Sequence, residues 1–236
     1  MCLLHTPYCM CPFRRQLKTR ASFLLLMYDD EVLKPSNSGR LIADLVPDTH
    51  AYLWSRTQVD PELIGVLNDP QYQPYIIFPE HYASPDQEIV QQPHDLSSPD
   101  WSIDPQCDHA RSHLFKRPLF VLLDGSWREA KKMFRKSPYL SGLPIFSFQP
   151  QEAGQYELRK GQRDFQLSTA EVAILAIESL GEVENAEAFK AWFSLFIESS
   201  LLSRNRAEGR DLTLRDQLAV RFQAQWAKTR AETCHA

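Results

Sequence analysis

The chain has 236 residues, of which 43% are hydrophobic and 24% are charged, and its formal net charge is −4. These values are typical of a globular protein, and they exclude one whose overall charge attracts nucleic acid. Any nucleic-acid partner would need a local basic surface. No secretory signal is recognisable and no apolar run is long enough to cross a bilayer, so we expect a cytoplasmic protein without a membrane partner.

The first 20 residues form a basic head that carries three cysteines, Cys2, Cys9 and Cys11. In a cytoplasmic protein such cysteines indicate a metal site or free thiols rather than disulfides. Next, the sequence predicts a buried strand at 22–27 and, after the loop LKPSNSGR, a helix at 40–45. Either the asparagine or the second serine of that loop could cap the helix.

Short apolar strands then alternate with helices, which favours an α/β fold with a mostly parallel sheet. Residues 84–117 are polar and rich in proline and indicate an insertion. We therefore expect a head at 1–20, a catalytic domain at 21–184 and a helical extension at 185–236. The predicted strands are 51–56, 74–79, 119–123 and 144–148, and the predicted helices are 61–68, one that starts at 127, 169–181, 186–202 and 214–228.

The stretch DGSW, from Asp124 to Trp127, stands where a buried strand passes directly into a helix. Ligands usually bind at the carboxyl ends of parallel strands, so Asp124 is a candidate base; it could equally be a polar residue that ends a strand. Ser126 and Glu129 have the spacing of a capping box. Trp127 would begin the helix and could simply pack beneath it.

Basic side chains gather after this turn and in a later loop. They suit the phosphates of a nucleic acid, but they could also be a solvated helix face and a solvated loop. A second capping box, formed by Ser168 and Glu171, opens the helix that starts at Thr169. That helix is either a well-capped core element or an anion-binding helix end. The basic residues are Arg128, Lys131, Lys132, Arg135 and Lys136 on the first helix, and Arg159, Lys160 and Arg163 in the loop.

Taken together, these motifs resemble the DTW-domain family. D-x-S-W after a buried strand is followed by a basic helix, Y-x-L-R and S-T-A-E, while KPSNSGRL and the cysteine head lie upstream. The likeness covers residues 2–180 in the family's order. It implies a Rossmann-like sheet with a C-terminal trefoil knot of the SPOUT type. The implied activity is that of a tRNA-uridine aminocarboxypropyltransferase, which moves the 3-amino-3-carboxypropyl group of S-adenosylmethionine to N3 of a uridine in the tRNA variable loop.

The resemblance also implies roles for the candidate residues. Asp124, with Ser126 and Trp127 of the signature, would act in catalysis, because N3 of uridine must lose a proton before it attacks. Burial beside Trp127 would make the carboxylate a stronger base, and Trp127 could stack on the uridine. The five cations of the helix that starts at 127, together with Arg163, would bind RNA. Candidates for S-adenosylmethionine are Lys34, Asn37, Arg40, Arg159, Ser168, Thr169 and Glu171.

The cysteine spacing C-x6-C-x-C matches the last three positions of the family's C-x2-C-x6-C-x-C pattern. This implies structural zinc, whose fourth ligand could be a cysteine upstream of this start, His5 or water. Ordinary free thiols are the alternative. Two other functions stay open: a SPOUT-like RNA methyltransferase and a zinc-bearing RNA-binding module without catalysis. A monomer and a homodimer are both compatible with the C-terminal helices.

Overall fold

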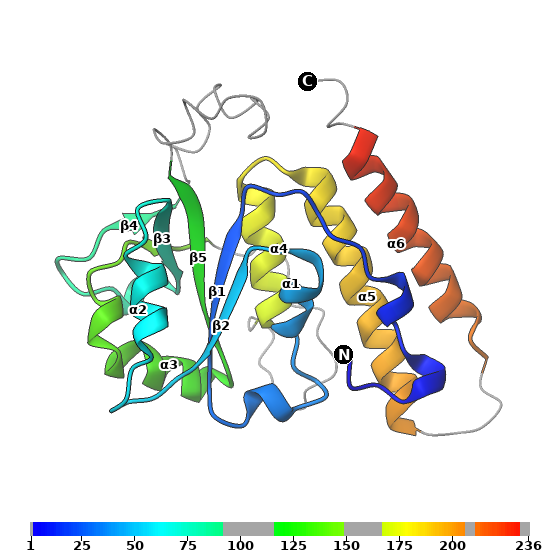
Figure 1. Cartoon of the computed structure of the whole chain (residues 1–236), viewed down its shortest axis with the longest axis horizontal. Coiled ribbons are helices and arrows are strands. Elements are labelled where there is room, and N and C mark those ends of the chain that lie inside the picture. Colours follow the sequence, from blue (N-terminus) through cyan, green and yellow to red (C-terminus); the bar gives the residue numbers. More distant parts are fainter. Residues whose placement is uncertain (1, 92–115, 149–166, 206–210, 232–236) are drawn as a thin grey trace. The chain divides into compact units, whose positions relative to one another are not determined.

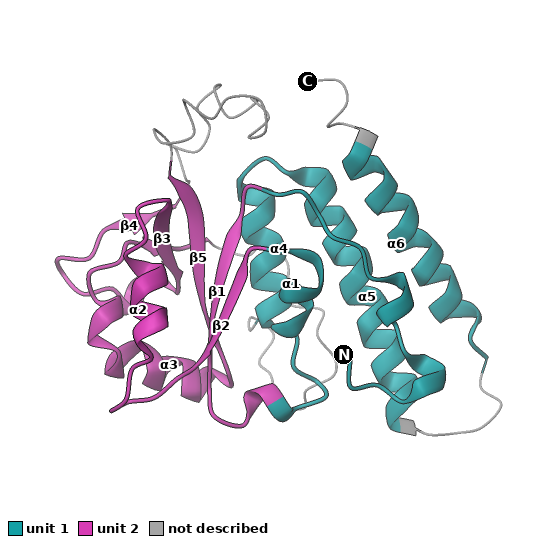
Figure 2. Cartoon of the chain, in the orientation of Figure 1, with its two compact units in different colours: residues 1–19, 33–47, 151–235 teal, residues 20–32, 48–150, 236 magenta. Residues whose placement is uncertain are grey.

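A computed structural model describes residues 2–91, 116–148, 167–205 and 211–231 (Figure 1). The chain forms two compact units, each built from segments that are separate in the sequence (Figure 2). Unit 1 comprises residues 1–19, 33–47 and 151–235, and unit 2 comprises residues 20–32 and 48–150. Among the described residues, no helix combines the length and apolar character that a membrane span needs.

Unit 2 contains a six-stranded sheet in which every pair of neighbouring strands is parallel. This confirms the predicted α/β class and the parallel sheet. The strand order is β2-β1-β5-β3-β6-β4. In chain order the strands are β1 (Ser22–Met27), β2 (Thr49–Leu53), β3 (Tyr72–Ile77), β4 (Ile89–Val90), β5 (Arg117–Asp124) and β6 (Ile145–Phe146).

One face of this sheet is covered by α2 (Pro61–Leu67) and α3 (Trp127–Lys136). A single apolar cluster joins Leu24 and Val121 of the central strands to Leu63 of α2 and Met133 of α3. All six residues of β1 are buried. Because successive strand residues point to opposite faces, the strand is buried on both sides, as its unbroken apolar sequence predicts.

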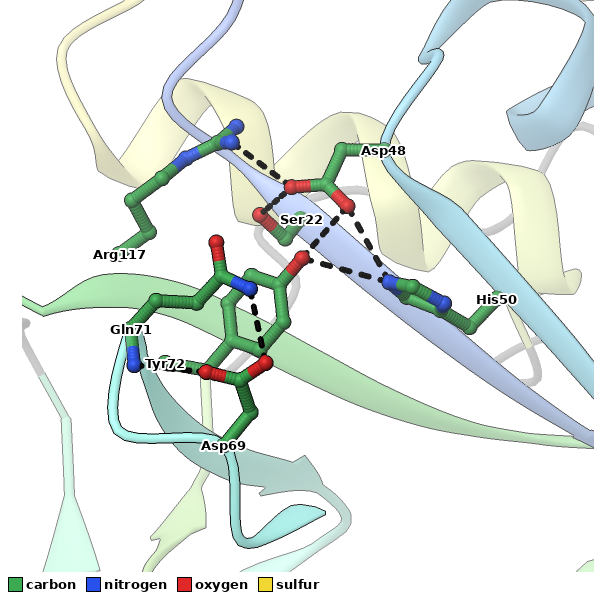
Figure 3. A network of polar contacts seen from close by, with 7 residues as sticks. All are labelled: Ser22, Asp48, His50, Asp69, Gln71, Tyr72 and Arg117. Carbon is green, nitrogen blue, oxygen red and sulfur yellow. Dashed lines mark hydrogen bonds and ion pairs between the residues drawn. The ribbon is translucent and has the colours of Figure 1, made fainter. Parts of the chain in front are cut away.

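At the amino ends of the strands, a polar network joins four strands through Asp48 (Figure 3). The Asp48 carboxylate accepts hydrogen bonds from Ser22 Oγ at 2.6 Å and Tyr72 Oη at 2.8 Å. It also pairs with Arg117 at 2.8 Å and lies 3.2 Å from His50 Nε2. Burial and the neighbouring Asp48 charge raise the pKa of Tyr72, so its hydroxyl stays a donor. The network ties β1, β2, β3 and β5 together at the edge away from Asp124.

Unit 1 is helical. Its hydrophobic interior includes Trp192 and Phe222, whose ring centroids are 4.8 Å apart. Short turns of 3₁₀ helix, Thr6–Tyr8 and Cys11–Phe13, shape the cysteine head. The helices of the unit are α1 (Arg40–Leu45), α4 (Thr169–Ser179), α5 (Val183–Asn205) and α6 (Thr213–Ala231).

Some boundaries differ from those expected. β2 begins at Thr49 and ends before Trp54, and β3 begins at Tyr72, so Pro74 lies inside a strand rather than beside one. Proline is tolerated there because β6 pairs with β3 only from Ile76 onward, which leaves the imide nitrogen without a ladder partner to lose.

The insertion predicted at 84–117 stays a prediction; that range includes the edge strand β4 and the first residue of β5. Residues 92–115 lie outside the described part of the chain. So do residues 149–166, and the trefoil knot therefore stays a prediction. The division into head, catalytic domain and helical extension also stays a prediction.

Candidate functional site

Asp124 is the last residue of β5, a central strand, and its Cα pairs with that of Met27. In the sheet, β1 and the next strand of the chain, β2, lie on one side of β5, whereas β3, β6 and β4 lie on its other side. Such a reversal of strand order is where parallel sheets usually bind ligands. Asp124 is only 2% exposed. The structure thus places a buried carboxylic acid at the most favourable position of the carboxyl edge.

The face on which Asp124 lies differs from the expectation. Leu119, Val121 and Leu123 belong to the cluster under α2 and α3, so by alternation Asp124 lies on the other face, with Phe120 and Leu122. Trp127 belongs to the α2–α3 cluster. Its indole is therefore not what buries the Asp124 side chain.

The turn that follows is tightly built. A Cβ at Gly125 would lie 3.2 Å from the Cβ atoms of both Glu129 and Tyr28, so a side chain here would force neighbours apart. Ser126 Oγ accepts the Glu129 N–H at 3.4 Å, and the Glu129 carboxylate accepts the Ser126 N–H at 2.7 Å. This is the predicted capping box. The Ser126 hydroxyl therefore has a structural role at the start of α3.

Trp127 has aromatic neighbours on its ring. It stacks on Phe78 with a centroid distance of 5.4 Å and an angle of 17°, and Tyr82 meets it edge-on at 5.9 Å. Lys131 Nζ lies 5.8 Å from the ring centroid. These contacts agree with the interpretation that Trp127 packs in the core. They leave less of the indole surface available to stack on a uridine.

The predicted RNA-binding residues of α3 lie on one helix, with Arg128, Lys132 and Lys136 at four-residue spacing. Lys132 Nζ donates to Tyr28 Oη at 2.8 Å. Within the described part of the chain, no carboxylate is paired with the charges of the five α3 cations. Arg159 and Arg163 lie outside the described residues.

The candidates for S-adenosylmethionine lie in unit 1, and two groups that are far apart in the sequence meet there. Asn37 Oδ1 accepts the Arg40 N–H at 3.0 Å, but the residue at the N-cap position of α1 is Gly39, not Asn37 or Ser38 as the sequence suggested. The neighbouring Ser38 Oγ accepts the Ala170 N–H, at the start of α4, at 3.3 Å. The KPSNSGR loop and the amino end of α4 are therefore in direct contact.

This contact also provides a hydrogen-bond acceptor for one main-chain N–H group in the first turn of α4. Ser168 Oγ accepts the Glu171 N–H at 3.3 Å, and the Glu171 carboxylate accepts the Ser168 N–H at 2.7 Å. With Ala170 bonded to Ser38, two first-turn N–H groups that were expected to bind a carboxylate already have acceptors. The cations among the described candidates are Lys34 and Arg40, whose guanidinium lies 5.6 Å from the Phe196 ring centroid.

The cysteines of the head converge. The Sγ atoms of Cys2, Cys9 and Cys11 all lie within 4.8 Å of one another, and Cys2 and Cys9 are 3.6 Å apart. Thiolates on one tetrahedral zinc, with bonds of about 2.3 Å, are separated by roughly 4 Å, so the cluster fits zinc. His5 is not in the cluster, and its main-chain N–H donates to Ser203 Oγ.

Comparison with known families identifies the chain. The model of the DTW domain matches residues 1–201. The chain belongs to the DTW domain family. This family is associated with tRNA-modifying enzymes. No solved structure matches the chain. The match ends within α5, so α6 of this DTW protein lies beyond the family model.

Sequence reasoning missed two aromatic residues of the DTW protein at the carboxyl edge. Tyr28 directly follows β1, and Trp54 directly follows β2. Their rings stack, with a centroid distance of 5.6 Å and an angle of 18°. Tyr28 follows the strand predicted at 22–27, so the rule that singled out Asp124 could have found it. Trp54 stands inside the strand predicted at 51–56, and only the observed end of β2 at Leu53 places it at the carboxyl edge.

Proposed function

We propose that this protein transfers the 3-amino-3-carboxypropyl group of S-adenosylmethionine to N3 of a uridine in the variable loop of tRNA. The observation that carries the proposal is the position of Asp124. It is the acid of the family signature, it is buried, and it lies at the carboxyl end of a central strand where the strand order reverses. Membership of the DTW family supports the same conclusion.

The reaction needs a base, and Asp124 would provide it. Its carboxylate would take the proton from N3 of the uridine, and the N3 lone pair would then bond to the γ-carbon of the methionyl arm. The bond from that carbon to sulfur breaks, and sulfur keeps the electron pair, so the sulfonium becomes a neutral thioether. S-adenosylmethionine is consumed and is a substrate of this reaction.

Transfer of the methionyl arm instead of the methyl group requires that the arm be held in place. Because two N–H groups at the start of α4 are occupied, we assign the arm's carboxylate to a cation, Lys34 or Arg40. Arg40 is anchored for this role, since its guanidinium donates to the Pro35 carbonyl and its own N–H to Asn37. Zinc bound by Cys2, Cys9 and Cys11 would stabilise the head.

The test is to incubate the protein with S-adenosylmethionine and unmodified tRNA, digest the tRNA, and weigh its nucleosides. We expect uridine enlarged by an aminocarboxypropyl group. A methylated nucleoside would instead establish a methyltransferase. Binding of tRNA that ignores S-adenosylmethionine, with no product, would establish a non-catalytic RNA-binding module.

Asp124→Asn keeps the size of the side chain but cannot take the proton. We expect product formation to fall by roughly 10²-fold or more, while tRNA binding is retained. The matched control is Asp69→Asn, which changes a partly exposed aspartate whose carboxylate contacts Gln71. Near-normal turnover by Asp124→Asn would exclude Asp124 as the base.

A further inference from the structure

Tyr28 and Trp54 form a fixed aromatic pair beside the signature turn. The Tyr28 N–H donates to the Asp124 carbonyl at 2.9 Å, and the Trp54 N–H donates to the Met27 carbonyl at 2.7 Å. Trp54 Nε1 also donates to the buried Ser137 Oγ at 2.9 Å. Main-chain bonds thus hold both residues to the strand ends, and the indole is oriented by a third bond. Both rings are partly exposed.

A cation lies against this pair. Lys132 Nζ is 5.1 Å from the Tyr28 ring centroid and 5.4 Å from that of Trp54, besides donating to the Tyr28 hydroxyl. Lys132 is exposed and has no carboxylate partner among the described residues. An aromatic surface with a solvated cation at its side provides what a single unpaired nucleotide needs, a stacking face for the base and a charge for the phosphate.

The pair lies on the other side of the sheet from Asp124. Tyr28 and Trp54 pack on the cluster under α3, together with Leu24 and Leu26, whereas Asp124 lies on the opposite face by strand alternation. A base on Tyr28 and Trp54 is therefore not the one that Asp124 deprotonates. Since the Tyr28 and Asp124 main chains are hydrogen-bonded, the two bases would be close along one RNA strand.

We propose that Tyr28, Trp54 and Lys132 bind a nucleotide that flanks the reacting uridine, with its base stacked on the aromatic pair and its phosphate on Lys132. This inference rests on the proposed function, because it takes the substrate to be RNA. The site would help to extrude the uridine, since a loop held open by a stacked neighbour has less stacking left to lose. Arg128 and Lys136, one turn away on either side of Lys132, continue the phosphate contacts along α3.

The test compares two substitutions at one position. Trp54→Leu keeps apolar volume against the cluster but removes the aromatic face, and Trp54→Phe keeps a face while losing the bond to Ser137. We measure binding of unmodified tRNA, without S-adenosylmethionine, by fluorescence anisotropy. Trp54→Leu should weaken binding roughly tenfold, and Trp54→Phe should stay within about threefold of the unsubstituted protein. Equal binding by the leucine variant and the unsubstituted protein would overturn the proposal.

Lys132 is tested by its charge. Lys132→Gln should reduce the slope of log binding constant against log salt concentration by about one, because one fewer counterion is released. Lys132→Arg keeps the charge and should keep the slope. An unchanged salt dependence in Lys132→Gln would refute the phosphate contact. The matched control is Lys228→Gln, which removes an exposed lysine from α6 and should leave tRNA binding and its salt dependence unchanged.

Product analysis separates failure of this inference from failure of the proposed function. If the unsubstituted protein forms the aminocarboxypropyl product and Trp54→Leu binds tRNA normally, the stacking site is wrong and the function stands. If the unsubstituted protein forms no product but its tRNA binding depends on Trp54, the function is wrong and the RNA site stands.

Discussion

Asp48 is the residue on which the amino edge of the sheet depends. Burial alone would raise the pKa of Asp48, but hydrogen bonds from Ser22 and Tyr72 and the charge of Arg117 hold it below its usual value. A carboxylate with a lowered folded-state pKa stabilises the protein above its unfolded pKa of about 3.9, and this contribution is lost as the pH falls through the folded value. Asp48 should therefore stabilise the sheet at neutral pH and cease to do so in acid.

We predict that Asp48→Asn lowers the free energy of unfolding by about 2 kcal/mol at pH 7, because Arg117 loses its partner in a partly buried network. The difference from the unsubstituted protein should narrow as the pH falls below about 4. Urea denaturation at several pH values measures both effects. Asp69→Asn, at the same edge but with its carboxylate bonded to Gln71 and not to Asp48 (Figure 3), is the control. If the difference in free energy of unfolding between the two proteins stayed constant from pH 7 to pH 3, the charge of Asp48 would not be what stabilises the sheet.

For single residues, the sequence predicted which side chains are chemically suited to a site better than it predicted which side chains touch one another. Asp124 could be chosen because its position after an apolar strand fixes its place at a sheet edge, and the two capping boxes could be found because their partners are three residues apart. The stacking of Tyr28 on Trp54 could not be predicted without the pairing of β1 with β2. Likewise, Ser38 contacts α4 only because of the tertiary fold, although its local sequence suggested a cap for α1.

Helix α6 braces the cysteine head although it lies beyond the family match. Arg215 donates to the Cys9 carbonyl at 2.8 Å, and its guanidinium lies 5.3 Å from the Phe13 ring centroid. Trp226 Nε1 donates to the Gln16 carbonyl at 3.0 Å. Both bonds fix main-chain atoms of the head from one helix. The geometry of the thiols should therefore depend on the docking of α6.

For protein loaded with the proposed zinc, we predict that Arg215→Ala loosens the head and speeds the loss of the metal to a chelator by severalfold. The arginine is 8% exposed, and its removal leaves the Cys9 carbonyl without this donor. The measurement is zinc release to a coloured chelator over time. Arg221→Ala, on the exposed surface of the same helix, should release zinc like the unsubstituted protein. Identical release by Arg215→Ala would show that α6 does not constrain the thiols.

For helices and strands, the amino-acid composition and the spacing of apolar residues were sufficient to predict most strands of the sheet. β1 and α1 have the predicted bounds, because a continuous apolar run and a proline after the helix leave few alternatives. β4 was missed because two residues carry no period, and only its pairing with β6 defines it. α6 was predicted as a helix, but its contacts with the head depend on side chains that the helical pattern does not distinguish.

The two units are interleaved along the chain, which crosses between them after residues 19, 32, 47 and 150. Unit 1 is therefore assembled from segments that are joined through unit 2. If unit 2 unfolded alone, residues 48–150 would become a long loop closed by unit 1, and the entropy of closing that loop would oppose the folded helices. Covalent connectivity alone thus predicts that the units unfold together.

Hydrogen exchange at increasing urea concentration tests this coupling. The slowest amides of β5 in unit 2 and of α5 in unit 1 should exchange through one common opening and show the same free energy. Asp48→Asn, which destabilises unit 2, should lower the protection of α5 by the same amount as that of β5, whereas Asp69→Asn should leave both unchanged. If Asp48→Asn weakened protection in β5 while α5 kept its own, the units would be independent despite their shared chain. Equal loss in both would make the interleaved chain, rather than either core, the unit of stability.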